Sequence, residues 1–174
     1  MWKQVGRPTG RKGYLEGLVL HNGQTMSGIG GGLCQLGNLI YWMALHTDLV
    51  VVERWRHSFD VFPDVNRTIP FGCGATLSYN YVDLQLKNDT DKTFKIKLWL
   101  DDEYLNGEIF VNEPISYTYK VVETDHQIQQ QWWGGYTRHN IIWKHKINCD
   151  GEVISEEIVA RNNAIMMYNP LLKE

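Results

Sequence analysis

The stretch Gly28-Ile29-Gly30-Gly31-Gly32-Leu33-Cys34-Gln35 governs how the whole chain is interpreted. A run of glycines ends at a single cysteine. Apolar residues then recur at three- and four-residue spacing: Leu33, Leu36, Leu39, Ile40, Met43 and Ala44. This period predicts a helix over residues 33–45 that begins at the glycines. Cys34 therefore falls in the first helical turn, where unpaired backbone N–H groups and the positive end of the helix dipole stabilise a thiolate.

Two interpretations of this stretch remain open. The glycines can leave room for a substrate to reach the sulfur, which would suit a nucleophilic cysteine. Alternatively, the glycines form only a tight turn and Cys34 is a small residue of the core, since cysteine is among the most buried residue types.

His57 is the candidate partner of the thiol. It lies in the segment 49–61, whose β-branched start and later alternation predict a strand. A helix, a short turn and a strand can bring His57 across from Cys34, as in papain-like hydrolases, where the imidazole takes the proton of the thiol. Asp60, Glu53 and Asp83 are candidates for a third group that orients the ring. The alternative is a half-buried strand histidine bonded to the backbone.

Composition narrows the class of protein. The chain has 174 residues, 43% hydrophobic and 21% charged, which is typical of one globular domain over residues 1–174. A formal net charge of −3 argues against nucleic acid as a partner. No apolar run is long enough to span a bilayer and no signal peptide opens the chain. Three widely spaced cysteines form neither a disulfide framework nor a metal-ligand cluster, so we expect no metal and no cofactor.

The expected fold is α+β. The domain begins with a glycine-rich loop and one N-terminal helix that carries Cys34, packed on a mainly antiparallel β-sheet, and its C-terminal half is rich in strands. Alternating residues predict strands over 76–87 and 93–100, which should pair as a hairpin around a turn at 88–91. Further strands are predicted over 115–122, 136–147 and 153–159, and Asp150-Gly151 predicts a hairpin turn between the last two.

Several of these motifs together resemble the VanW domain. They are Gly30-Gly31-Gly32-Leu33-Cys34-Gln35, Val52-Glu53-Arg54 with His57-Ser58, and Gly74-Ala75-Thr76 leading to Tyr81-Val82-Asp83-Leu84. The resemblance covers roughly the first half of the chain densely. The chain departs from the family pattern at Gly74, where longer members often carry Asp. It departs again at Leu36-Gly37-Asn38-Leu39, where members commonly have Val-Ser-Thr-Thr.

The resemblance implies a role at the cell wall and a link to vancomycin resistance. Some VanW-domain proteins act as L,D-transpeptidases through the cysteine of this motif. Here Cys34 would be the nucleophile and His57 the base, acting on peptidoglycan stem peptides. Supporting or substrate-binding roles would fall to Gly31, Gly32, Gln35, Glu53, Arg54, Ser58 and Asp83.

Two alternatives stay open at this stage. One is a cysteine peptidase or amidase acting on cell-wall peptides, and the other is a non-catalytic module that binds the wall or a partner. A transpeptidase would work outside the cytoplasm, in the cell envelope. If the protein is not a transpeptidase, the lack of a targeting segment in this chain makes the cytoplasm the expected compartment. The sequence gives no indication of the oligomeric state.

Overall fold

The computed structural model describes residues 1–21, 24–65 and 67–171. The helical elements are α1 (Trp2–Val5), the 3-10 helix η1 (Gly10–Lys12) and α2 (Leu33–Ala44). The strands are β1 (Glu16–His21), β2 (Gln24–Ile29), β3 (Val50–Glu53), β4 (Phe59–Asp60), β5 (Gln85–Lys87), β6 (Phe94–Leu100), β7 (Leu105–Val111), β8 (Tyr117–Gln130), β9 (Tyr136–Asn148) and β10 (Val153–Met166).

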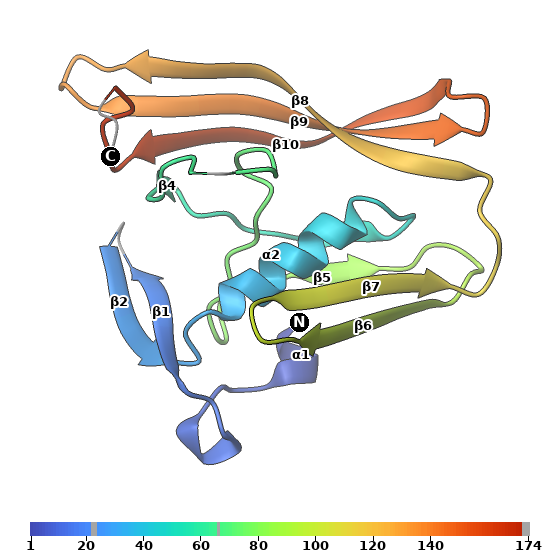
Figure 1. Ribbon diagram of the computed structural model, residues 1–174, viewed down its shortest axis with the longest axis horizontal. Coiled ribbons are helices and arrows are strands. Elements are labelled where there is room, and N and C mark those ends of the chain that lie inside the picture. The colour runs from blue at the N-terminus through green and yellow to red at the C-terminus, as the bar shows by residue number, and fades with distance from the viewer. Residues whose placement is uncertain (22–23, 66, 172–174) are drawn as a thin grey trace.

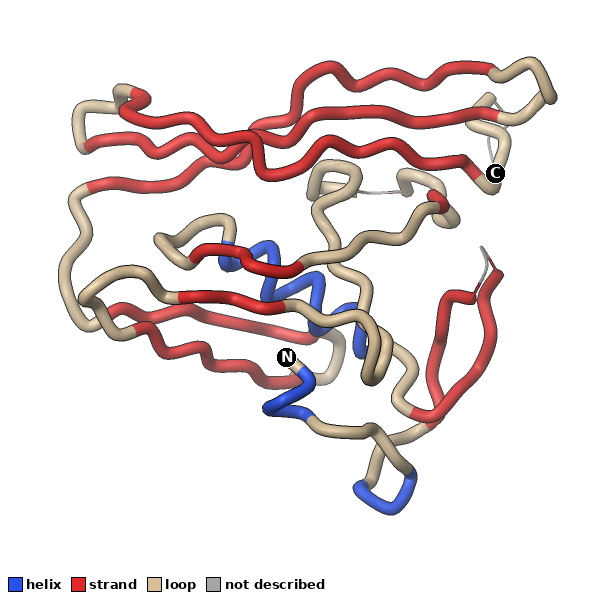
Figure 2. The backbone as a smooth tube through the Cα atoms, turned by 180° about the vertical axis from the view of Figure 1, so that it is seen from behind, coloured by secondary structure: helices blue, strands red, loops and turns tan. Residues whose placement is uncertain are grey.

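These strands form four separate sheets. The largest has the order β4-β10-β9-β8, and the pairs β1-β2, β3-β5 and β6-β7 form the other three. All pairings are antiparallel except that of β4 with β10. The long twisted layer of β8, β9 and β10 lies on one side of the molecule and the β6-β7 hairpin on the other, with α2 between them (Figures 1 and 2). The β1-β2 hairpin stands beside the first turn of α2 (Figure 1).

The expected α+β fold is wrong. The chain is mostly β, with 46% strand and 11% helix, and it has a second α-helix, α1. The expected single sheet is also divided, so α2 does not rest on one antiparallel sheet. α2 packs against β7 and β3, which belong to different sheets, so it can bury more of its surface than a helix on one open sheet. The expected abundance of strands in the C-terminal half agrees with the structure.

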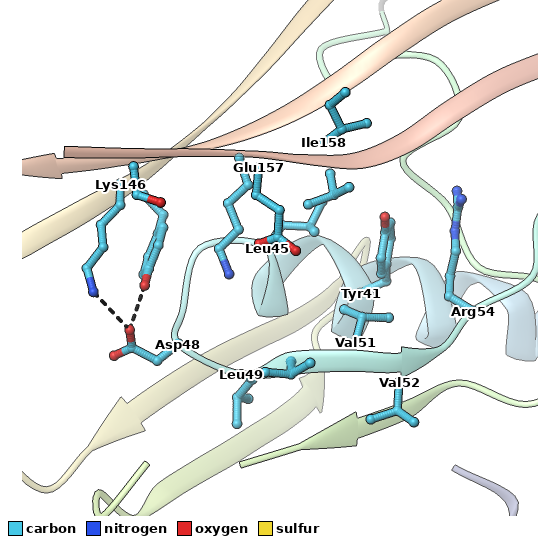
Figure 3. Close-up of a pocket in the computed structure, with 15 residues that line it drawn as sticks. Tyr41, Leu45, Asp48, Leu49, Val51, Val52, Arg54, Lys146, Glu157 and Ile158 are labelled. Carbon is cyan, nitrogen blue, oxygen red and sulfur yellow. Dashed lines mark hydrogen bonds and ion pairs between the residues drawn. The ribbon is translucent and has the colours of Figure 1, made fainter. Parts of the chain in front are cut away.

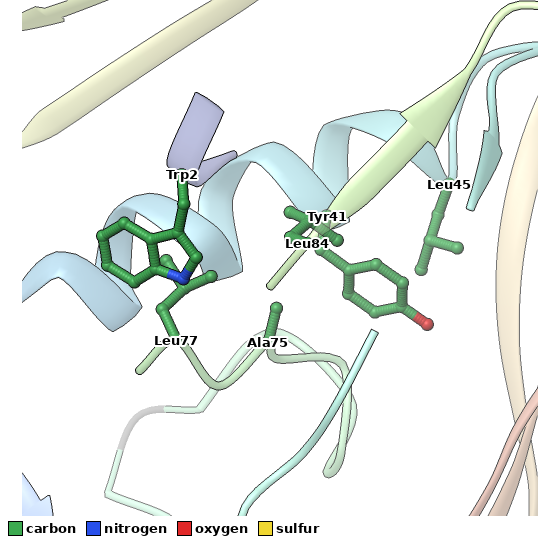
Figure 4. Close-up of a cluster of buried hydrophobic side chains, with 6 residues drawn as sticks. All are labelled: Trp2, Tyr41, Leu45, Ala75, Leu77 and Leu84. Carbon is green, nitrogen blue, oxygen red and sulfur yellow. The ribbon is translucent and has the colours of Figure 1, made fainter. Parts of the chain in front are cut away.

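The hydrophobic core forms where α2 meets α1 and the irregular segment 75–84. Its buried members are Trp2, Tyr41, Leu45, Ala75, Leu77 and Leu84 (Figure 4). Gly37 lets the helix approach closely, because a Cβ there would stand 2.8 Å from Leu77 Cδ1. The Trp2 indole N–H donates to the Val82 carbonyl at 2.7 Å, which fixes α1 to the same segment.

The expected hairpin between residues 76–87 and 93–100 is wrong. Residues 76–84 are irregular, and β5 pairs with β3. β6 pairs with β7 across a turn where the Asp101 carboxylate accepts the backbone N–H groups of Glu103 (2.9 Å) and Tyr104 (2.6 Å). A turn closed by an Asp side chain favours the pairing of β6 with β7. The alternation of polar and apolar residues, which predicted the pairing of 76–87 with 93–100, does not reveal such a turn. The predicted helix near 33–45 and the hairpin at Asp150-Gly151 are confirmed by α2 and by the β9-β10 pair, with Gly151 at φ +84°.

Candidate active site around Cys34

The glycines before α2 have different structural roles. Gly32 caps the helix in the left-handed region, at φ +88°, with open space where a Cβ would stand. Gly31 passes against the backbone of Gly17 in β1, and a Cβ on Gly17 would lie 2.7 Å from the Gly31 carbonyl oxygen. Gly30 also has a positive φ, at +76°. The run of glycines therefore joins the β1-β2 hairpin to the helix at close range.

The Cys34 backbone N–H stays available in the first turn of the helix. The N–H groups of Gly32, Leu33 and Gln35 donate to the carbonyls of Leu18 (2.9 Å), Gly30 (3.4 Å) and Gly32 (2.9 Å). Among the described residues, the Cys34 N–H has no such partner. Four N–H groups run from Gly32 to Gln35. Among the described contacts, the Cys34 N–H is the one that could donate to a developing oxyanion without first losing an existing hydrogen bond.

The Cys34 thiol is partly buried and packs against the core. Its sulfur lies 3.7 Å from the Leu77 carbonyl oxygen, to which the S–H donates. The neighbouring Thr76 N–H donates to the Trp55 carbonyl at 2.7 Å. Segment 76–77 thus contacts both the first turn of α2 and the chain just before His57.

His57 lies outside the regular strands, between β3 and β4. The predicted strand over 49–61 is therefore interrupted, because residues 54–58 bond to segments far apart in the sequence. Trp55 O accepts from Thr76 and Ser58 O accepts from the Ile165 N–H at 3.3 Å. Burial lowers the pKa of His57 below 6.5. In the part of the chain that is described, no hydrogen bond joins the His57 ring to the Cys34 sulfur, and the dyad stays a prediction.

The three carboxylates considered for orienting His57 are engaged elsewhere. Glu53 accepts hydrogen bonds from Trp55 Nε1 at 3.1 Å and from Gln85 Nε2 at 2.5 Å. Asp83 accepts from the Met1 amino group (2.8 Å) and from the Trp2 N–H (3.1 Å). Burial alone would raise the pKa of Asp83, but these bonds hold it below its ordinary value.

Asp60 belongs to a buried network on the inner face of the large sheet. Its Oδ2 lies 3.3 Å from Arg138 Nη1 and accepts the Tyr168 hydroxyl at 2.9 Å. Asp64 completes the network, with its Oδ2 2.6 Å from Arg138 Nη2. Asp60 thus joins β4 to Arg138 of β9 and to Tyr168 just after β10, and among the described residues it has no hydrogen bond to His57.

Arg54 is committed to the backbone. Its Nε donates to the Gly74 carbonyl at 2.8 Å, its Nη2 donates to the Gly72 carbonyl, and its guanidinium lies over the Tyr41 ring at 4.7 Å. Burial lowers its pKa. The side chain therefore fixes loop 72–74 on the helix. Gln35 and Ser58 are both exposed.

Two polar residues near Cys34 were missed by the sequence reasoning. Asn38, one turn after Cys34 on α2, accepts the Ala75 N–H through Oδ1 at 2.6 Å. A Cβ on Gly74 would stand 2.7 Å from that oxygen, so the Asn38 amide fills the space beside Gly74. Thr76 Oγ1 is buried and has no hydrogen-bond partner among the described residues. The sequence differs from the VanW pattern at both positions 38 and 74. These two differences together could have indicated that the two residues are neighbours.

The other two cysteines differ sharply from Cys34. Cys73 is buried, and burial raises the pKa of its thiol to about 12, which keeps it protonated. Cys149 is exposed. Within residues 1–21, 24–65 and 67–171, no group of three or more His, Cys, Asp or Glu side chains could hold a metal ion. None of the described helices is long and apolar enough to cross a membrane.

The comparisons with known proteins agree with this arrangement of motifs. The family model described as VanW like protein matches residues 1–110. The chain belongs to the VanW family. Its Gly30–Gln35 glycine–cysteine motif and its His57 both lie within the matched part of the VanW domain.

Two curated relatives are similar over different lengths. The chain is 31% identical over 167 residues to the Vancomycin B-type resistance protein VanW of Enterococcus faecalis, which covers 96% of this chain and 61% of that protein. It is 28% identical over 93 residues to the uncharacterized protein YoaR of Bacillus subtilis, covering 53% of this chain and 29% of YoaR. The chain thus spans less than two thirds of either relative. No solved structure matches it.

A cavity of about 540 Å³ lies away from Cys34, between the large sheet and the second half of α2 with β3 (Figure 3). Tyr41, Leu45 and Val51 line it from below, and Lys146, Glu157 and Ile158 line it from the sheet. Neither Cys34 nor His57 is among its lining residues. The cavity and the cysteine are therefore two distinct features of the molecule.

Proposed function

We propose that this VanW-family chain catalyses cysteine-dependent acyl transfer on peptidoglycan stem peptides and serves vancomycin resistance. The observation that carries the proposal is the position of Cys34 in the first turn of α2, with its own backbone N–H available and with open space at Gly32. The name of the enterococcal relative supports the link to resistance. Vancomycin binds a terminal D-alanyl-D-alanine, and a tetrapeptide donor stem lacks that end.

In this reaction the Cys34 thiol gives its proton to the His57 imidazole, and the thiolate attacks the carbonyl carbon before the terminal D-alanine. The Cys34 N–H stabilises the resulting oxyanion. Breakdown of the tetrahedral intermediate breaks the C–N bond, His57 returns its proton to the departing D-alanine amine, and a thioester remains. The side-chain amine of a second stem then attacks the thioester and loses a proton to His57, which regenerates the thiol.

The lowered pKa of His57 is compatible with this role, since a neutral imidazole at neutral pH can accept a proton. The hydrogen bond from the thiol to the Leu77 carbonyl has the opposite effect. This contact directs the S–H at the Leu77 carbonyl instead of at the imidazole. Binding of substrate would have to separate Cys34 from Leu77 and bring the sulfur toward His57.

This same contact favours a second candidate, a non-catalytic module that binds the cell wall or a partner. In such a protein Cys34 would be a small residue of the core, held by Leu77. The two candidates differ in one observable property, the formation of a covalent acyl-enzyme at Cys34.

The deciding experiment is incubation of the protein with a purified tetrapeptide-stem muropeptide, followed by mass spectrometry of protein and products. Transfer predicts an adduct on Cys34 and a cross-linked dimer, both absent in Cys34→Ala and retained in Cys149→Ala. An adduct with only a shortened, hydrolysed stem would identify a peptidase. Absence of any adduct on the wild-type protein, with muropeptide affinity retained in Cys34→Ala, would identify the binding module.

A further inference from the structure

The cavity between α2 and the large sheet contains charged groups of both signs. Figure 3 shows Lys146 reaching from the sheet toward Asp48, Glu157 reaching from the sheet toward the helix, and the Tyr41 hydroxyl pointing from the helix toward the sheet. Apolar side chains, among them Leu45, Leu49, Val51 and Ile158, also line the cavity, together with the polar residues Arg54 and Ser155. A volume of about 540 Å³ falls within the range of small-molecule sites, which combine apolar walls with a few polar groups.

One acidic group in this wall already has its partners. Asp48 accepts the hydroxyl groups of Tyr117 and Tyr119, each at 2.5 Å, and lies 3.6 Å from Lys92 Nζ and 3.5 Å from Lys146 Nζ. Burial alone would raise its pKa, but the tyrosine hydroxyls and the lysines hold the pKa below its ordinary value. Asp48 is thus an ionised acceptor that shapes one end of the cavity and has little capacity left for a ligand.

The lysines keep N–H donors that the described residues do not use. Lys144 Nζ donates to the Thr47 carbonyl at 2.6 Å and lies 4.3 Å from the centre of the Tyr119 ring. Lys146 Nζ lies 3.6 Å from the centre of the Tyr117 ring, and no hydrogen bond from it is found among the described residues. An ammonium group has three donors, so both side chains can still bind a carboxylate.

Glu157 supplies the opposite charge. It lines the cavity, and among the described residues its carboxylate makes neither a hydrogen bond nor an ion pair within 4.0 Å. The Tyr41 hydroxyl likewise has no hydrogen-bond partner in the described part of the chain, although the residue is 1% exposed. Donors on two lysines, an acceptor on Glu157 and apolar walls match a ligand that has a carboxylate, an amine and an apolar side chain.

We propose that this cavity binds a small zwitterion with an apolar body, either a free amino acid or a short peptide with unblocked ends. The carboxylate lies against Lys144 and Lys146, the ammonium group against Glu157, and the side chain against Leu45 and Ile158. Along α2, Tyr41 and Leu45 are roughly 10–16 Å from Cys34, so the site does not depend on the thiol or on the proposed acyl transfer.

Calorimetric titration of the full chain tests the proposal with four probes: leucine, leucyl-leucine, N-acetyl-leucyl-leucine and leucyl-leucine amide. Blocking either end removes one charge, so each blocked dipeptide should bind about tenfold more weakly than leucyl-leucine. The ratio of leucine to leucyl-leucine affinity distinguishes an amino-acid site from a peptide site. Failure of all four probes to bind, or equal affinity of blocked and unblocked dipeptides, would overturn the proposal.

The Glu157→Gln variant tests whether Glu157 is the residue that contacts the amine of the ligand. In this variant N-acetylation should no longer weaken binding, whereas in Lys144→Gln amidation should weaken binding less than in the wild type, because Lys146 still faces the carboxylate. The matched control is Glu156→Gln, which removes the same charge from the next residue of β10, where the carboxylate lies 3.7 Å from His145 Nε2. Successive strand residues face opposite sides of a sheet, so Glu156→Gln should leave all four affinities unchanged. An equal effect of both glutamate substitutions would refute a specific site, and Cys34→Ala should bind all four probes as the wild type does.

Discussion

Gly17 and Gly31 lie backbone against backbone, so closely that a Cβ on Gly17 would stand 2.7 Å from the Gly31 carbonyl oxygen. A Cβ on Gly31 would overlap the Gly17 carbonyl group. Hydrogen bonds on either side, from Gly30 N–H to Leu15 O and from Gly32 N–H to Leu18 O, both at 2.9 Å, hold the two segments together. The entry to α2 is thereby fixed to the β1 strand by contacts that only glycine permits.

Gly31→Ala should therefore destabilise the protein by about 3 kcal/mol, because a backbone carbonyl cannot move aside as a flexible side chain can. Urea denaturation followed by circular dichroism measures the change. Gly10→Ala is the control, since a Cβ at Gly10 meets nothing within 4 Å. A Gly31→Ala variant as stable as Gly10→Ala would show that the β1-β2 hairpin is not held against the helix in solution.

Cys34 should be alkylated faster than Cys149 at pH 6 if it acts as a nucleophile, although Cys149 is the more exposed of the two. The reason is that the first helical turn favours a thiolate. Cys73 should react last, because burial raises the pKa of its thiol to about 12. Iodoacetamide labelling read by peptide mapping gives the three rates. Faster labelling of Cys149 than of Cys34 would contradict the nucleophile and support a structural cysteine.

His57 should make the folded state less stable in mild acid. Burial lowers its pKa in the folded protein below 6.5, so the unfolded chain binds more protons near and below that pH. The free energy of unfolding therefore rises with pH through this range, and stability is lost as the pH falls below about 6.5. Denaturation of the wild type and of His57→Gln at pH 7.5, 6.5 and 5.5 measures the effect. The loss should be smaller in the variant, and parallel curves would contradict a buried imidazole.

Asp48→Asn should cost about 2 kcal/mol of stability, because it removes the charge that two tyrosine hydroxyls and two lysines share. The pKa of Asp48 is held below 3.8, so its contribution is present above that pH and is lost as the pH falls through the folded value. The stabilities of the wild type and of Asp48→Asn should thus converge as the pH falls through the folded pKa of Asp48. Asp89→Asn is the control, since among the described residues Asp89 forms an ion pair only with the exposed Lys87 side chain.

Several features followed from local sequence alone. The period of Leu33 to Ala44 predicted α2, since a helix depends mainly on contacts one turn apart. Asp150-Gly151 predicted the β9-β10 turn for a similar reason, because the short turn has a positive φ at Gly151, which favours glycine. The Gly30–Gln35 motif also placed Cys34 in the first helical turn, where the structure has it.

Strand pairing and the surroundings of His57 did not follow from local sequence. Residues 76–84 alternate like a strand, yet Ala75, Leu77 and Leu84 are buried against α2, and this packing replaces the expected hairpin. Asp101 closed the β6-β7 turn through its side chain, which no alternation pattern encodes. Arg54, expected beside a substrate carboxylate, instead holds loop 72–74.

The sequence by itself determined the helix, its glycine entry, the position of Cys34 and the resemblance to the VanW domain. Only the tertiary structure decided that the strands divide into four sheets, that the Cys34 thiol meets the Leu77 carbonyl, and that a charged cavity forms beyond Tyr41. The physical reason is the range of the interactions. Helical period and turn chemistry act between residues that are close in the chain, whereas Asp48 meets Tyr117, Tyr119 and Lys146 only because the fold brings β8 and β9 over the end of α2.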